Sequence, residues 1–376
     1  MTHQKTVIKR EECNLKRTAR KIFVVLLLFM LTVGLVACNA EKTQGNNNTK
    51  NTNGANNDAQ VIIKIADNLP KTHLISTLGT LPWIDRIEEL GKGKIKVEYY
   101  PAEQLGKASS LLDIVKNKVA DIALIGPQWI GDVMPLSSVS GNPGLVKDAV
   151  SGSRAFNKLV QEDLYELEFK PNKIKPLWAA TTNPYQIVNS KHPVEAIKDF
   201  KGLKIRTADG LQEKIMHSWG VTAVTIPGPE MYTAWDRGTV DGTLLSLFSW
   251  PAYQLDSIAK YATVNASLSA FGLTFSVNEQ VWNSWPKDVQ DAVWLASQEI
   301  VDKFGNGVVE HENELMKEYV ETSHVEFYTL PEDELQEWNN ELQPFNKKWA
   351  EDLDAKGSPG TKILEKFKQY NEEFSN

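Results

Sequence analysis

The segment KGLKIRTADG ends a short extended stretch with an arginine, Arg206. In a strand, Leu203 and Ile205 point to one face and Arg206 points to the other. The guanidinium then lies at the carboxyl end of the strand, where open α/β sheets bind their ligands. Its paired N–H donors match the two oxygens of a carboxylate. The segment alone thus leaves two interpretations open: a solvated strand end, paired with Asp209, and a residue that binds an anion.

Signatures of catalysis and of metal binding are absent from the sequence beyond residue 38. This part contains no GxGxxG, GxxxxGK[ST], HExxH or GxSxG pattern, so the common signatures of nucleotide binding, metalloproteases and serine hydrolases are missing. None of its five histidines has a second His or Cys at the spacing of metal ligands. The sequence thus predicts no cofactor, no metal and no enzyme, although two carboxylates distant in sequence leave a hydrolase open as an alternative.

Strands and helices alternate in two groups, the second of which positions Arg206. The first group is expected to have strands at 61–66, 94–101 and 121–126 and helices at 74–90 and 109–117. The second is expected to have extended stretches at 176–189, 203–206 and 222–227 and helices at 194–200, 211–220 and 230–238. This alternation is typical of mostly parallel sheets, and two such groups imply two lobes with a cleft between them.

An apolar pattern of helical period runs from Trp285 past Glu312. It predicts one unusually long helix that braces both lobes, with Gly305 and Gly307 as the positions where it could bend.

The chain begins with an expected export signal. Residues 1–21 carry seven Lys or Arg against two Glu, and the uncharged run 22–37 follows. This run is shorter than the ~20 residues that a bilayer span normally needs. Its end, LVAC, resembles the lipobox of bacterial lipoproteins, which implies acylation of Cys38; an uncleaved membrane anchor is the alternative. Residues 38–60 contain eight Asn and almost nothing apolar, which predicts a flexible tether.

Charge and cysteine content narrow the classes of partner. Cys13 and Cys38 are the only cysteines, so an exported domain without its signal has no disulfide framework. Loss of residues 1–37 removes seven positive and two negative charges and changes the formal net charge from −7 to −12. A surface this acidic argues against nucleic acid as a partner.

Three segments, VEYYPAEQLGKASSLLDIVKNKVADIALIG, DFKGLKIRTADG and IPGPEMYTAWDRGTVDG, resemble the solute-binding proteins of TRAP transporters, the tripartite ATP-independent importers. The resemblance covers most of residues 61–330. It implies an α/β, periplasmic-binding-protein-like fold of two lobes, each with a central β-sheet flanked by helices, and a long C-terminal helix bracing both lobes. It also implies that Arg206, which matches the arginine of the family's K-x-R strand, forms a salt bridge with the carboxylate of an organic acid.

The implied divisions are a signal peptide (1–37), an Asn-rich tether (38–60), lobe I (61–180 with 270–312) and lobe II (181–269 with 313–376). Four further residues are expected to face the cleft because they follow a strand: Asn68, Gln128, Trp129 and Trp250. The resemblance adds Gln186, twenty residues before Arg206, with its neighbours Asn183 and Tyr185. His73 shares the loop of Asn68. Gln186 stands where sialic-acid-binding relatives carry a second arginine, and Gly228 stands where relatives often carry an aromatic residue, which would leave room in the pocket.

The resemblance implies a lipid-anchored protein at the outer face of the bacterial plasma membrane. It would bind a small carboxylate, pass it to the small and large membrane subunits of a TRAP transporter, and bind no nucleic acid. Two alternatives stay open: a ligand sensor for a membrane receptor, and a surface-anchored extracellular hydrolase.

Overall fold

The computed structural model describes residues 60–322 and 324–375. The expected signal peptide (1–37), the acylation site Cys38 and the tether up to residue 59 therefore lie outside the described residues. The described residues belong to one compact unit.

The first sheet has five strands in the order β2-β1-β3-β10-β4. They are β1 (Val61–Ala66), β2 (Ile95–Tyr100), β3 (Ile122–Ile125), β4 (Ile174–Thr181) and β10 (Gly272–Asn278). β1 pairs in parallel with β2 and β3, whereas β10 is antiparallel to β3 and β4. The strands expected at 61–66, 94–101 and 121–126 are thus confirmed as β1, β2 and β3.

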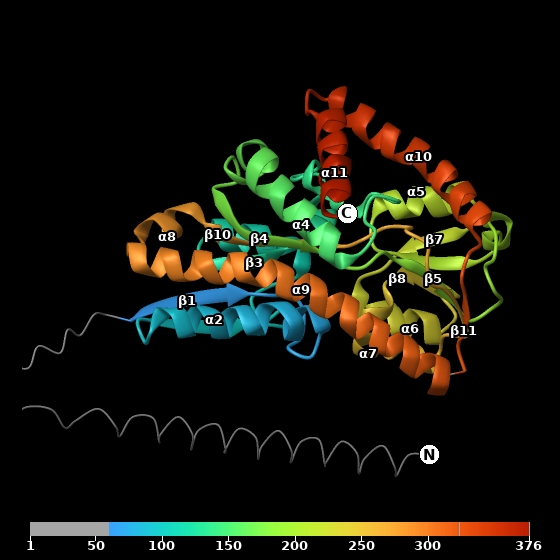
Figure 1. Cartoon of the computed structure of the whole chain (residues 1–376), viewed down its shortest axis with the longest axis horizontal. Helices are drawn as coiled ribbons and strands as arrows, with labels where there is room; N and C mark the ends of the chain where they lie inside the picture. The colour runs from blue at the N-terminus through green and yellow to red at the C-terminus, as the bar shows by residue number, and fades with distance from the viewer. Residues whose placement is uncertain (1–59, 323, 376) are drawn as a thin grey trace, which may run out of the picture. The chain divides into compact units, whose positions relative to one another are not determined.

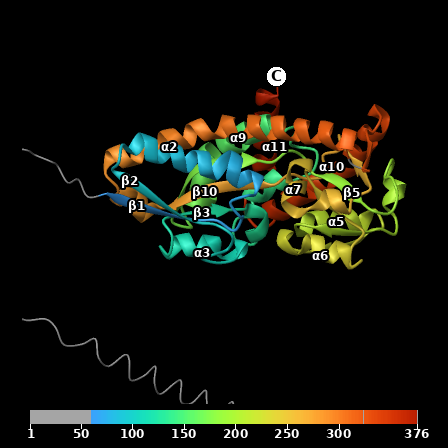
Figure 2. The same cartoon turned by 90° about the horizontal axis from the view of Figure 1, so that it is seen from below.

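Helices cover both faces of this sheet, as Figures 1 and 2 show. α2 (Leu81–Gly91) packs on one face through Trp83 and Ile87, and α3 (Leu111–Lys116) packs on the other. α4 (Ala149–Leu159), which continues as a π-helix over Val160–Phe169, and the short α8 (Glu279–Ser284) complete the layer structure. The first sheet with α2, α3, α4 and α8 is called lobe I.

The second sheet has six strands in the order β11-β9-β5-β8-β6-β7. They are β5 (Gln186–Asn189), β6 (Lys204–Thr207), β7 (Thr222–Thr225), β8 (Gly242–Leu245), β9 (Tyr261–Thr263) and β11 (Glu326–Tyr328). β6 is parallel to both of its neighbours, β7 and β8. With α5 (Gly210–Ser218), α6 (Met231–Asp236) and α7 (Trp250–Tyr253), this sheet is called lobe II.

Two predictions about the second group of elements are wrong. The extended stretch expected at 176–189 is two strands, β4 and β5, that belong to different sheets. Residues 182–185 therefore cross between the lobes, and residues 264–271, between β9 and β10, cross back. The helix expected at 194–200 is a single 3-10 turn at Ile197–Phe200. The alternating two-sheet architecture itself is as expected.

The long helix is confirmed as α9 (Lys287–Thr322), 36 residues that run along both lobes in Figures 1 and 2. Its lobe I half contacts an aromatic cluster in which Trp178 stacks on Phe275 at 4.9 Å and meets Phe304 of α9 at 6.0 Å. At Gly305, a Cβ would lie 2.8 Å from the carbonyl oxygen of Ala149. Gly305 therefore lets the start of α4 approach the backbone of α9, which is a packing role for this residue.

Two further helices follow α9. Trp338 of α10 (Glu332–Asp354) packs against Phe200 and Trp219 of lobe II, at 5.2 and 5.8 Å. Farther along α10, Asn346 Nδ2 donates to the carbonyl of Pro143 at 2.9 Å, which ties the helix to lobe I.

The last helix, α11 (Gly360–Phe374), packs against α4 of lobe I. This placement differs from the expectation that residues 313–376 all lie with lobe II. The apolar residues of α11, Ile363, Leu364 and Phe367, share a core with the α4 residue Phe156, which explains it.

The remaining helical segments are short. They are a π-helix at Ser76–Thr80 and 3-10 turns at Ala108–Ser110, Pro127–Ile130, Ser137–Gly141, Gly228–Glu230, Leu247–Ser249 and Leu255–Ser257. Among the described helices, none combines the length and the apolar character needed to cross a membrane.

Candidate functional site

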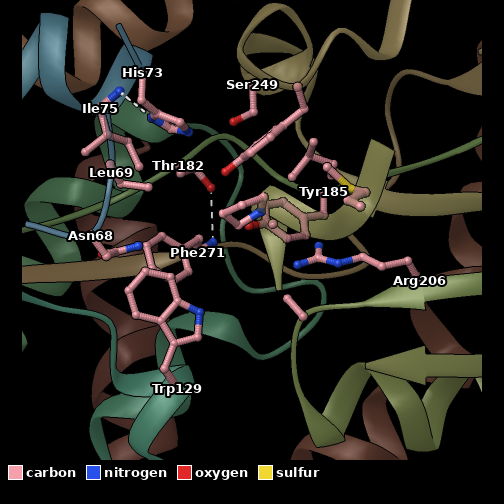
Figure 3. A pocket seen from close by; sticks show the side chains of 16 residues that line it. Asn68, Leu69, His73, Ile75, Trp129, Thr182, Tyr185, Arg206, Ser249 and Phe271 are labelled. Atoms are coloured by element: carbon pink, nitrogen blue, oxygen red, sulfur yellow. Dashed lines mark hydrogen bonds between the residues drawn. The ribbon is translucent and has the colours of Figure 1, made fainter. Parts of the chain in front are cut away.

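Arg206 lies near the carboxyl end of β6, and its side chain points into a cavity between the lobes (Figure 3). The side chain is only 5% exposed. Its Nε donates to the carbonyl oxygen of Ile226, just beyond β7, at 2.7 Å. The parallel pairing of β6 with β7 places Ile226 beside Arg206. The bond fixes the stem of the side chain, and the terminal nitrogens of the guanidinium remain directed to the cavity. The alternative of a solvated strand end is therefore excluded.

Arg206 forms no salt bridge with any described residue, although the charge of the nearby Asp209 acts on it from a greater distance. The nearby Asp209 accepts from the backbone N–H groups of Leu211 and Gln212, both at 2.9 Å, and so caps α5. Burial lowers the pKa of Arg206, and burial raises the pKa of Asp209. A buried guanidinium without a salt bridge is costly to the fold, so it is a candidate for binding an anion from outside the protein.

The cavity has walls from both lobes. Its lobe I wall is formed by Asn68, Leu69, His73, Ile75 and Trp129, with Thr182 and Phe271 from the two crossing segments. Its lobe II wall is formed by Tyr185, Arg206, Ala208, Gly228, Pro229, Met231, Leu245, Ser249 and Tyr253. The cavity has a volume of about 70 Å³. One water needs roughly 10–15 Å³, so the space suits a small organic molecule.

Aromatic rings line much of the cavity. Trp129 and Phe271 lie 4.7 Å apart between ring centroids with their planes 39° apart. The rings of His73 and Tyr253, from opposite walls, meet edge to face at 5.7 Å. Such surfaces bury a ring or an aliphatic chain well, whereas the guanidinium suits an acidic group.

Buried groups behind the walls hold their loops in place. Asp67, at the end of β1, accepts from the backbone N–H of Leu69 and the hydroxyl of Tyr99, both at 2.8 Å. Burial raises the pKa of Asp67 to about 6. These bonds fix the turn that presents Asn68 and Leu69 to the cavity.

On the other side, Glu312 of α9 accepts from Asn183 Nδ2 at 2.8 Å and from the backbone N–H of Phe248 at 2.9 Å. Burial raises the pKa of Glu312 to about 7. The carboxylate thereby links a crossing segment of the chain to the loop that carries Ser249.

The structure brings four of the eight expected cleft residues together: Asn68, Trp129, Tyr185 and Arg206 line one cavity. His73 lines it too. The other lining residues that sequence reasoning missed include Thr182 and Phe271, from the crossings, and Ser249 and Tyr253, which follow β8. The signal for the last two was their position beyond the carboxyl end of a strand parallel to β6.

The other four expected cleft residues lie outside this cavity. Gln186 forms two hydrogen bonds with the backbone of Ala266: Nε2 donates to the carbonyl oxygen at 2.6 Å, and Oε1 accepts from the N–H at 2.9 Å. These bonds join the start of β5 to the crossing segment 264–271. Asn183 bonds Glu312 and also accepts from the N–H of Ala149 at 2.7 Å. Both amides are occupied by the protein.

The side chain of Gln128 forms a hydrogen bond with Ser140 Oγ at 3.1 Å. It lines a different cavity, one wall of which is formed by residues of α10. Trp250 is 1% exposed and stacks on Tyr319 of α9 at 5.8 Å. These two side chains, like those of Asn183 and Gln186, are removed from the candidate site because of their packing. Nor do the described residues include any group of three His, Cys, Asp or Glu side chains that could hold a metal ion.

A two-lobed α/β fold with a small, partly aromatic cavity around one buried cation defines a protein that binds a small solute between its lobes. Residues 65–352 match the DctP family, bacterial extracellular solute-binding protein family 7, and the chain belongs to that family. Its relatives are solute-binding proteins of TRAP transporters, and the chain is accordingly not an enzyme.

Known proteins resemble the chain over most of its length. A C4-dicarboxylate-binding periplasmic protein of Rhodobacter capsulatus is 27% identical over 289 residues, which is 74% of this chain and 83% of the relative. A TRAP solute-binding protein of Bordetella bronchiseptica, solved with bound (R)- and (S)-mandelate, superposes with a TM-score of 0.74 at 22% identity. The match covers 83% of this chain and 99% of that protein. A TRAP protein of an unidentified marine microbe, specific for aromatic acids and solved with 3-hydroxybenzoate, has a TM-score of 0.78 at 21% identity, with 84% and 99% covered. At these identities, the two structures support the fold.

Proposed function

We propose that this protein captures a small organic acid in the cavity between its lobes and delivers it to the membrane subunits of a TRAP transporter. The observation that carries the proposal is the buried Arg206, which lines the cavity and forms no salt bridge with a described residue. A carboxylate would supply the missing negative charge through two parallel hydrogen bonds. The solutes of the two solved relatives, mandelate and 3-hydroxybenzoate, are carboxylates with a ring, which the aromatic walls here would also suit.

Arg206 sets the class of solute but supplies only part of the affinity. A charged hydrogen bond contributes about 1.5–3 kcal/mol net, whereas micromolar binding requires about −8 kcal/mol. The remainder is expected from apolar contact with both walls as the lobes close by hinge bending. The hinge would consist of the crossing segments 182–185 and 264–271 together with α9, and the closed form would be recognised by the small and large membrane subunits.

The first test is calorimetric titration of the full-length protein with carboxylates, matched against their uncharged amides. We expect micromolar binding of at least one acid and no binding of its amide, because only the acid offers an anion to Arg206. Binding of amides and acids with equal affinity would contradict the proposal.

We further propose that the protein is a lipoprotein, acylated at Cys38 and held at the outer face of the plasma membrane by the tether at 38–60. The support is the sequence alone: a charged segment, an apolar run and the ending LVAC. In cells, Cys38→Ser is expected to abolish incorporation of radiolabelled palmitate, whereas Cys13→Ser is expected to leave it unchanged. Unchanged labelling of the Cys38→Ser protein would contradict acylation at this residue.

A further inference from the structure

The lobe I wall places a hydrogen-bond donor of defined chemistry in the cavity. His73 is 1% exposed, and its Nδ1 accepts a hydrogen bond from the backbone N–H of Ile75 at 3.1 Å. Burial lowers the pKa of His73 to about 4, so the imidazole is neutral at physiological pH. A neutral ring that accepts at Nδ1 carries its proton on Nε2.

The Nε2–H of His73 is available to a solute. Figure 3 shows the ring directed into the cavity, with Ile75 bonded to one of its nitrogens. Within residues 60–322 and 324–375, no side chain or carbonyl accepts a hydrogen bond from the other nitrogen. A ring that is turned over would place a carbon where Nδ1 now lies, and the buried N–H of Ile75 would lose its acceptor, which favours the observed orientation.

The charge of the cavity is fixed by one residue. Of the described residues that line it, Arg206 alone carries a full charge at neutral pH. One carboxylate neutralises that charge. A second carboxylate on the same solute would be buried among neutral groups, which is costly even when it is hydrogen-bonded.

We propose that the cavity selects monocarboxylates that carry a neutral acceptor, a hydroxyl or carbonyl oxygen, remote from the carboxylate, and that His73 is the residue that binds this acceptor. The inference rests on the proposed role of Arg206 as the carboxylate-binding residue. Lobe II then binds the charge of the solute, and lobe I distinguishes its other end. Dicarboxylates of the same length are excluded by charge and not by size.

The experiment compares two matched sets of solutes by calorimetric titration of the full-length protein at pH 7.5. The first set is benzoate, 3-hydroxybenzoate and isophthalate, and the second is butyrate, 4-hydroxybutyrate and succinate. In at least one set, the hydroxylated acid is expected to bind roughly 3- to 10-fold more tightly than the plain acid, the range of one neutral hydrogen bond. The dicarboxylate is expected to bind more than about 10-fold more weakly than the hydroxylated acid.

Two variants separate the donor from the fold of the loop. His73→Asn keeps an acceptor near the position of Nδ1, for the N–H of Ile75, and removes the donor at the position of Nε2. His73→Gln reaches that position with an amide N–H but offers Ile75 no acceptor. We expect His73→Asn to bind the plain and hydroxylated acids equally and His73→Gln to retain the preference, even if its melting temperature is lower.

Three results would overturn the inference while leaving the proposed function intact. They are an unchanged preference in His73→Asn, equal binding of the plain and hydroxylated acids in both sets by the wild-type protein, and a dicarboxylate that binds as tightly as the hydroxylated acid. Binding of none of the six acids at 10 mM would instead count against the proposed function, and the inference would fall with it.

Discussion

The two walls of the cavity differ in kind. The lobe II wall carries a full positive charge on Arg206, whose stem is held between parallel strands by a 2.7 Å bond to Ile226. The lobe I wall is neutral and consists of a turn fixed by Asp67, the rings of His73 and Trp129, and apolar side chains. Charge is therefore on one side of the cleft, while shape and hydrogen-bond polarity are on the other.

This division separates two tasks that binding proteins must perform. Arg206, held by the strands of lobe II, can attract an acid without a contact from lobe I, because the attraction between charges acts over a distance. The fit of lobe I to the bound acid then determines how far the closed form is favoured, since a ligand shifts a conformational equilibrium only through its differential affinity for the two forms. Loss of the charge on lobe II should thus remove binding of the whole class of acids, whereas changes on lobe I should reorder acids within it.

The largest effect is expected from Arg206→Met. Removing one partner of a buried charge pair costs about 2–5 kcal/mol, so affinity for every carboxylate should fall at least about 30-fold by calorimetry. The free energy of unfolding without solute should change by no more than about 1 kcal/mol, or rise, because an uncompensated buried charge is replaced by an apolar chain.

The matched control is Arg237→Met, at the exposed end of α6, which should change neither quantity. If Arg206→Met were strongly destabilised, or if it lost some acids and kept others, the assignment of charge binding to lobe II would be refuted.

Sequence reasoning found residues on both walls: Arg206 and Tyr185 on lobe II, and Asn68 and Trp129 on lobe I. Arg206 follows from alternation in a four-residue strand and from the rule that ligands bind at carboxyl ends of strands. By contrast, Gln128 and Trp129 are neighbours after β3, and only the 3-10 turn at Pro127–Ile130 determines that Trp129 faces the cavity while Gln128 does not. The sequence pattern around the end of a strand does not determine which of two neighbouring side chains faces the cavity.

The crossings between lobes were also beyond sequence reasoning. The run PLWAATTNPYQIVN is apolar enough to be one strand, and its division at 182–185 depends on tertiary bonds. Asn183 is held by Glu312 and Ala149, and Gln186 by Ala266, all from segments distant in the sequence. These amides were expected at the cleft because Gln186 matches the position of a second arginine in relatives; in the folded protein they bond the crossing segments to the rest of the chain.

An intermediate effect is expected from Glu312→Gln, at the junction of the two walls. Burial raises the pKa of Glu312 to about 7 in the folded protein, whereas the ordinary pKa of a glutamate is 4.5. The contribution of Glu312 to the free energy of unfolding is thus greatest below pH 4.5 and is lost as the pH rises to 7, by at most about 3 kcal/mol. Denaturant titrations from pH 4.5 to 8 should show a flatter dependence for Glu312→Gln than for the wild-type protein.

The control for that comparison is Glu310→Gln, an exposed position two residues earlier on α9, which should keep the wild-type dependence on pH. Parallel curves for the wild-type protein and Glu312→Gln would mean that this carboxylate is already ionised at pH 5. The junction between the walls would then be insensitive to physiological pH.

The smallest effect is expected from Gly228→Ala on the lobe II wall, and it tests whether this wall also contributes shape. The new Cβ would lie 2.8 Å from the hydroxyl oxygen of Tyr253, so the ring of Tyr253 must move. Because that ring meets His73 across the cavity, its movement should change the space available to the uncharged end of the solute without disturbing Arg206. We expect affinity for ring-bearing acids to fall about 3- to 10-fold, a cost of about 1 kcal/mol, with a smaller loss for short aliphatic acids.

The control is Gly210→Ala, where a Cβ meets nothing within 4 Å, and it should leave the affinities for both kinds of acid unchanged. An equal loss for ring-bearing and aliphatic acids in Gly228→Ala would show that the substitution acts on the carboxylate end, and the separation of charge from shape would then fail within lobe II itself.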